Sequence, residues 1–273
     1  MTSAGTIPWA CRTIFLCLQA FSAFTTAARP QTKEVRIAAA ADLKFAMQDL
    51  ATVFEKQTGI TVAVTYGSSG NFFSQLQSGA PFDVFFSADT EYAERLDAAG
   101  LGEPGTLSVY AIGRLAVWMP ATAGTDLAHR GWNALLDAGV QRVSVANPKH
   151  APYGMAAVAA LRRAGIYDRV KAKLIFGEDV SQAAQFVESG NAQAGIIAMS
   201  FAVSPAMRAG EVWEIPANGY PPIKQAAIVM KGSPNRRAAR MFLEFVREPR
   251  AAEILAKDGF ALPSSTSARR ARQ

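Results

Sequence analysis

The most constraining feature of this sequence is a repeated alternation of short apolar runs with helical patterns that end in glycine. Residues 35–41 are apolar except for Arg36, as is typical of a buried strand. Apolar residues then recur at helical spacing from Leu43 to Phe54, and Gly59 closes that helix. The recurrence of this βαβα order predicts an α/β chain with mostly parallel sheets flanked by helices.

The same patterns predict the remaining elements. Further strands are expected over 60–66, 83–88, 115–119, 143–146, 194–198 and 223–230. Further helices are expected over 71–78, 90–99, 155–164, 182–188, 236–247 and 251–257. Because no linker separates the two halves, two lobes would have to be joined by crossing strands, with a cleft between them.

Most of the net positive charge comes from the two ends of the chain. The 273 residues hold 28 Lys and Arg against 22 Asp and Glu, and 18% are charged, which is below the roughly 25% of ordinary domains and favours a well-filled core. Without Arg12 and the three arginines of the last five residues, the net charge is only +2. No basic stripe runs through the body, so no nucleic-acid partner is expected.

The amino-terminal segment is typical of a secretory signal peptide. Arg12 precedes the apolar stretch 13–24, and small residues lead to Ala28 before the polar Arg29 and Pro30. A buried first helix is the alternative, but Pro30 would break its continuation. We therefore predict a signal peptide over 1–28, cleavage after Ala28 and export.

The scarcity of cysteine and histidine restricts the chemistry. Cys11 and Cys17 both lie in the predicted signal peptide, so the mature chain would have no disulfide, thiolate nucleophile or thiolate metal site. Only His129 and His150 remain. Neither a Gly-x-Ser-x-Gly nor a His-Glu-x-x-His motif occurs. An exported hydrolase or lyase is thus the weakest reading, and no catalytic residue is predicted.

Four predicted strand-to-helix junctions carry residues suited to an anion. They are Ala41-Asp42, the Gly-Ser-Ser-Gly stretch at 67–70, and the segments 147–154 and 177–181. Ligands gather at such junctions because unpaired N–H groups and helix dipoles point there. Each junction alone is a weak signal that is more often an ordinary helix cap or turn. The spacing of the four junctions in the sequence does not establish that they lie close together in the folded chain.

Several of these segments resemble, in order, the periplasmic molybdate-binding proteins of ABC importers. The matching stretches are 38–51, 67–70, 78–89, 147–154, 177–180 and 251–260. Together they cover about 35–262, nearly all of the expected mature chain. The blocks at 78–89 and 177–180 are the most specific.

The resemblance implies a two-lobed type II periplasmic binding fold that closes on molybdate or tungstate by hinge motion. By position, the donors would be the backbone amides of Ala41 and Asp42, the hydroxyl and amide of Ser69, Tyr153, and the amide of Val180. The same residues would be the metal contacts if molybdate is counted as a metal ligand. Neutral donors in a dry cleft stabilise a dianion strongly.

The resemblance also implies where the protein acts, its partners and its lobe boundaries. It implies a periplasmic monomer without a cofactor that serves a membrane permease and its ATPase. Lobe 1 would comprise 33–114 plus 226–263, lobe 2 would comprise 115–225, and 264–273 would form a flexible basic tail.

Two positions depart from the family pattern. Many members have Ser or Asn in place of Asp42, and one branch has a tyrosine in place of Ala198, for which Tyr153 compensates. A carboxylate facing a dianion is repulsive, so Asp42 either turns into its own helix as a cap or meets a protonated oxygen. We favour the cap. The alternative predicts a protonated oxyanion, such as phosphate or arsenate, or a small organic acid.

Overall fold

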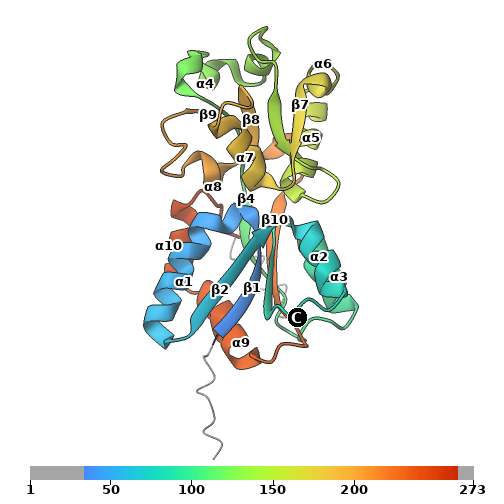
Figure 1. Cartoon of the computed structure of the whole chain (residues 1–273), viewed down its shortest axis with the longest axis vertical. Helices are drawn as coiled ribbons and strands as arrows, with labels where there is room; N and C mark the ends of the chain where they lie inside the picture. The colour runs from blue at the N-terminus through green and yellow to red at the C-terminus, as the bar shows by residue number, and fades with distance from the viewer. Residues whose placement is uncertain (1–33, 264–273) are drawn as a thin grey trace, which may run out of the picture. The chain divides into compact units, whose positions relative to one another are not determined.

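The computed structural model describes residues 34–263 (Figure 1). The predicted signal peptide at 1–28, its cleavage point, Cys11, Cys17 and the predicted tail at 264–273 lie outside the described residues.

The first sheet has five strands in the order β2-β1-β3-β10-β4. Their bounds are β1 (Glu34–Ala40), β2 (Thr61–Gly67), β3 (Val84–Ser87), β4 (Ser108–Gly113) and β10 (Ile223–Val229). Strands β1, β2 and β3 are parallel, whereas β10 runs antiparallel to β3 and β4. Ala40 is the register partner of Gly67, so the residues that follow β1 and β2 leave the sheet side by side.

The second sheet also has five strands, in the order β7-β6-β8-β5-β9. Their bounds are β5 (Leu115–Met119), β6 (Val143–Ala146), β7 (Leu174–Gly177), β8 (Ala194–Ala198) and β9 (Glu211–Glu214). Strand β6 is parallel to β7 and β8, and β5 is antiparallel to β8 and β9. Ala146 pairs with Gly177, which places the segments after β6 and β7 next to each other.

Helices flank both sheets (Figure 1). The longer ones are α1 (Lys44–Thr58), α2 (Ser69–Gln77), α3 (Thr90–Ala98), α5 (Pro152–Arg163), α7 (Val180–Glu188), α9 (Arg236–Val246) and α10 (Pro249–Lys257). The short ones are α4 (Leu127–Arg130), α6 (Tyr167–Val170), α8 (Met199–Ala202), η1 (Ala41–Leu43), η2 (Ala121–Ala123), η3 (Gly131–Leu136), η4 (Lys171–Lys173) and η5 (Ala217–Gly219). None of the helices within 34–263 combines the length and apolarity that crossing a membrane requires.

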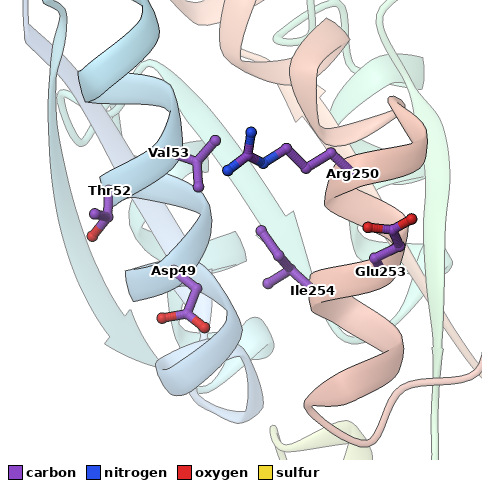
Figure 2. A pocket seen from close by; sticks show the side chains of 6 residues that line it. All are labelled: Asp49, Thr52, Val53, Arg250, Glu253 and Ile254. Atoms are coloured by element: carbon purple, nitrogen blue, oxygen red, sulfur yellow. The ribbon is translucent and has the colours of Figure 1, made fainter.

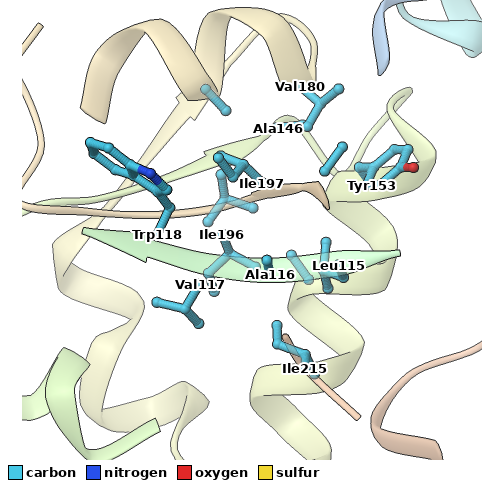
Figure 3. Packing of buried hydrophobic residues seen from close by; sticks show 14 of the residues in the cluster. Leu115, Ala116, Val117, Trp118, Ala146, Tyr153, Val180, Ile196, Ile197 and Ile215 are labelled. Atoms are coloured by element: carbon cyan, nitrogen blue, oxygen red, sulfur yellow. The ribbon is translucent and has the colours of Figure 1, made fainter. Parts of the chain in front are cut away.

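Each sheet has its own hydrophobic core. In the first lobe, Phe242 of α9 packs edge-on against Phe54 of α1, with ring centroids 5.0 Å apart, and against Phe86 of β3 at 5.8 Å. Figure 3 shows part of the second core, with Trp118 at one side and Ala146, Val180 and Tyr153 at the other. The second core thus ends in residues of the predicted binding junctions.

The α/β class with mostly parallel sheets is confirmed: in each sheet four of the five strands run in one direction, and one strand, β10 in the first sheet and β5 in the second, runs against them. Several other details correct the expectations. The predicted lobe boundary between 225 and 226 is wrong for the sheet, because all of β10 from Ile223 pairs within the first sheet. Strands β4, β7 and β9 were not predicted. Helices α2 and α5 begin two and three residues earlier than expected, at Ser69 and Pro152.

Candidate functional site

A small cavity lies where segments of the two lobes meet. Its volume is about 10 Å³, roughly the room that one water needs. It is lined by Ala40, Ala41, Asp42, Gly67, Ser68, Ser69, Ala88, Ala151, Pro152, Tyr153, Asp179 and Val180. All five residues predicted as anion donors are in this set, so the structure brings together what sequence spacing left apart.

The first lobe positions its share of the cavity through the paired ends of β1 and β2. Ala41 and Asp42 form the start of η1 directly after β1. Ser68 caps α2 by accepting a hydrogen bond from the Asn71 N–H at 3.3 Å, which makes Ser69 the first residue of the helix. The Ser69 hydroxyl accepts from the Ala88 N–H at 2.9 Å, so its own hydrogen is left to donate to a ligand.

The second lobe contributes the N-termini of α5 and α7. Pro152 is the first residue of α5, where a missing N–H costs nothing. A Cβ on Gly154 would lie 2.1 Å from the Ala146 carbonyl oxygen, so only glycine lets α5 start this close to β6. Asp179 caps α7 by accepting from the N–H groups of Ser181 and Gln182. Val180 is then the first helical residue, a position whose N–H has no partner within the helix.

The electrostatics of the cavity come from dipoles rather than from cations. None of the described residues that line it is Lys or Arg. Helices α2, α5 and α7 all begin at the cavity, and each N-terminus carries partial positive charge. The Asp179 carboxylate is already engaged as a cap. The arrangement can therefore stabilise a small anion with N–H and O–H donors.

Asp42 does not cap its helix, which corrects the favoured expectation. The N-cap of η1 is Ala40 and that of α1 is Leu43, and neither helix start has a side-chain cap. The Asp42 side chain is fully buried. Its Oδ2 accepts from the Gln225 amide nitrogen, the Tyr153 hydroxyl and the Asp42 N–H also interact with the carboxylate, and Oδ1 has no hydrogen-bond partner in the described structure. Burial raises the pKa of Asp42 to about 6, against the lowering effect of these hydrogen bonds.

Gln225 and Tyr110 belong to the site and were missed by sequence reasoning. The Tyr110 hydroxyl donates to Gln225 Oε1 at 2.6 Å, so the Gln225 amide nitrogen faces Asp42 and the Tyr153 hydroxyl, 3.3 Å away. Burial, together with the Asp42 charge, raises the pKa of Tyr153 well above its usual range, so the phenol stays protonated. A glutamine within the otherwise apolar run of 225–230 was the available signal.

Contacts between the lobes border the cavity. The Gly70 N–H donates to the His150 carbonyl at 3.0 Å, and the Ser68 hydroxyl lies 2.9 Å from His150 Nδ1. The Asn71 amide donates to Glu178 Oε1 at 2.6 Å. We call these three contacts the cavity-edge contacts. They join the start of α2 to the segments that precede α5 and α7.

A larger pocket of about 270 Å³ lies elsewhere, between α1 and α10. Figure 2 shows Arg250 reaching from α10 toward Val53 of α1, with Asp49 and Ile254 nearby. It is lined only by first-lobe residues and holds none of the predicted donors. Across 34–263, no group of three or more His, Cys, Asp or Glu residues is placed to hold a metal ion.

Comparison with known proteins identifies a family and several relatives that this chain resembles. Residues 35–261 match the model of a family described as bacterial extracellular solute-binding protein. The molybdate-binding protein ModA of Azotobacter vinelandii is 36% identical over 245 residues, covering 89% of this chain and 96% of that protein. ModA of Rhodobacter capsulatus is 36% identical over 227 residues, covering 83% and 88%.

Solved structures of related proteins also match the fold of this chain. The Azotobacter vinelandii periplasmic molybdate-binding protein matches with a TM-score of 0.79 at 33% identity, covering 84% of this chain and all of that one. The sulfate-binding protein SubI of Mycobacterium tuberculosis matches with a TM-score of 0.70 at 17% identity, covering 87% and 90%, which shows the fold alone. The expected two-lobed fold of periplasmic binding proteins is thus confirmed. The chain belongs to the bacterial extracellular solute-binding protein family.

Proposed function

We propose that this protein captures molybdate or tungstate in the cavity between its lobes and delivers it to an ABC importer. The observation that carries the proposal is the convergence of three helix N-termini on one small cavity whose described lining has no Lys or Arg. A compact dianion suits this set of donors because it can accept from many oriented dipoles at once. The names and structures of the most similar relatives support this ligand class.

The proposed donors are the five residues that the cavity brings together. They are the amides of Ala41 and Asp42, the hydroxyl and amide of Ser69, Tyr153, and the amide of Val180. If molybdate is counted as a metal ligand, these are also its contacts. We propose no cofactor and no catalytic residue, since the work of such a protein is binding and release.

The proposed setting follows from the family. A signal peptide at 1–28 would direct the chain to the periplasm, where it would act as a monomer. Its partners would be a membrane permease and the attached ATPase. No nucleic acid is proposed as a partner.

A second candidate is favoured by one observation, the buried carboxylate of Asp42 in the cavity lining. An ionised carboxylate accepts hydrogen bonds but donates none, so it suits a ligand that carries a proton. Phosphate, arsenate or a small organic acid would then be preferred.

Titration calorimetry on residues 29–273 tests these alternatives. Molybdate, tungstate, sulfate, phosphate and arsenate are titrated separately at pH 7.5. We expect one-to-one binding of molybdate and tungstate and no heat from sulfate or phosphate. Preference for phosphate or arsenate would replace the first proposal by the second.

Removing one neutral donor checks the proposed mode of binding. We expect Ser69→Ala to weaken molybdate binding about 10- to 100-fold, because a hydrogen bond to a charged group contributes roughly 1.5–3 kcal/mol and about 1.4 kcal/mol corresponds to tenfold in affinity. Calorimetry measures the change. Ser78→Ala is the control, since Ser78 is an exposed serine at the far end of α2. Equal affinities of both variants would contradict a donor role for Ser69.

A further inference from the structure

Asp42 is a fully buried cavity-lining residue whose negative charge conflicts with the proposed dianion. We propose that Asp42 takes up a proton from solvent when the oxyanion binds, so that a neutral carboxylic acid faces the dianion. This inference rests on the proposed function and names a specificity-determining group within the same site. It differs from capping and from accepting a proton from the ligand.

The first argument is the charge balance of the cavity. The described lining contains two acidic residues, Asp42 and Asp179, and no Lys or Arg. The Asp179 carboxylate accepts hydrogen bonds from the N–H groups of Ser181 and Gln182. Asp42 is fully buried, so neither solvent nor a cation screens it from a dianion. Two carboxylates and a dianion cannot all stay charged so close together in a low-dielectric site. A carboxyl group that can take up a proton therefore does so.

The second argument is the hydrogen bonding of the Asp42 carboxyl group. Oδ2 already accepts from Gln225, whereas Oδ1 is buried and has no partner among the described residues. An unpartnered buried oxygen is unfavourable as an acceptor. Once protonated, Oδ1 becomes a donor, and an oxyanion oxygen supplies the acceptor that the protein does not.

The third argument concerns the Asp42 amide. In the ionised form, the N–H of Asp42 is attracted to its own carboxylate. Protonation removes the charge that attracts this N–H. The same event therefore frees a backbone donor that the proposed binding mode assigns to the anion.

The surroundings of Asp42 leave it as the group that changes charge. The groups that interact with Asp42 electrostatically or by hydrogen bonds are Tyr110 from β4, Tyr153 from α5, Asp179 ahead of α7, Gln225 from β10 and, through the Asp42 carbonyl, Ser200 from α8. Burial raises the pKa of both tyrosines well above their usual range, so they remain neutral donors. The pKa of Asp42 is about 6 without a ligand, so Asp42 is mostly ionised at pH 7.5 and a proton has to be taken up.

Calorimetry in two buffers of different ionisation enthalpy measures this uptake directly. At pH 7.5 we expect about one proton to be taken up per molybdate bound by the unmodified protein. Between pH 7 and 9 the dissociation constant should rise nearly tenfold per pH unit, since each unit lowers the protonated fraction about tenfold. Uptake below about 0.2 proton would overturn the proposal.

Asp42→Asn is the diagnostic variant, because its amide mimics the neutral acid. We expect no proton uptake, a nearly constant dissociation constant from pH 7 to 9, and binding at pH 8 about 100-fold tighter than that of the unmodified protein. Proton uptake that persists in this variant would overturn the proposal. If the variant does not fold, the unmodified protein still tests the proposal. The two measurements are the number of protons taken up per molybdate and the change of the dissociation constant with pH.

His150→Gln is the matched control. His150 contacts Ser68 at the cavity edge, and histidines as a class change charge between pH 5 and 8. The proton uptake should survive this substitution, and its loss would reassign the proton to His150. If none of the five oxyanions binds the unmodified protein, the proposed function itself fails. Binding without uptake removes only this inference.

Discussion

Replacing Phe242 with alanine is expected to lower the free energy of unfolding by about 4 kcal/mol, because truncating a core phenylalanine removes its burial and leaves a cavity. The Phe242 side chain is completely buried. Its ring packs against Phe54 at 5.0 Å, Phe86 at 5.8 Å and Phe245 at 6.2 Å between centroids. It therefore links α9 to α1 and to the central strand β3.

Urea unfolding followed by circular dichroism measures this loss. Phe176→Ala is the control, since Phe176 on β7 is 47% exposed and its truncation should change the unfolding free energy by about 0.5 kcal/mol or less. A loss for Phe242→Ala within 1 kcal/mol or so of the control would show that the first core does not depend on this aromatic cluster.

The second large effect concerns ligand affinity. We expect Gly70→Ala to weaken oxyanion binding about 100-fold, which corresponds to roughly 2.7 kcal/mol. A Cβ at this position would lie 2.7 Å from the His150 carbonyl oxygen and 2.9 Å from the Tyr92 hydroxyl. Because the backbone oxygen of His150 belongs to the other lobe, the clash is relieved by separating the lobes. That separation also breaks the 3.0 Å bond from the Gly70 N–H and opens the cavity.

Calorimetry and thermal unfolding together distinguish this effect from misfolding. The melting temperature of Gly70→Ala should fall by only a few degrees, while its affinity drops. Gly232→Ala provides the comparison, since a Cβ there meets nothing within 4 Å, and its affinity should be unchanged. Unaltered binding by Gly70→Ala would mean that the cavity-edge contacts do not support the bound state.

Much of the fold was predictable because most helices and strands have a local signal in the sequence. The helix from Lys44 to Thr58 was signalled by apolar spacing, and Gly59 ends it in the left-handed conformation at φ 67°. Two of the strands that were missed carry only a weak signal. Glu211–Glu214 and Leu174–Gly177 are edge strands of four residues, and their apolar runs of two and three residues are shorter than the roughly 4–8 residues that mark a buried strand.

The site was predictable only in part, for a geometric reason. Its junctions follow from local turn chemistry, which sequence spacing reveals. The position of Asp42 does not, because η1 inserts a turn before α1 and removes the carboxyl from the capping position. Its partner Gln225 is 183 residues away in sequence, and only the crossing of β10 into the first sheet brings them together.

The placement of β10 between β3 and β4 also bears on how the chain acquires its structure. Strands β5 to β9 come from one continuous stretch, whereas the first sheet lacks an interior strand until the chain has passed through the whole second lobe. Contacts that close long loops form slowly. The second lobe can therefore assemble while the first is still a partial sheet with two unpaired edges at its centre. The sheet of the first lobe is therefore completed last, although β1 to β4 come first in the sequence.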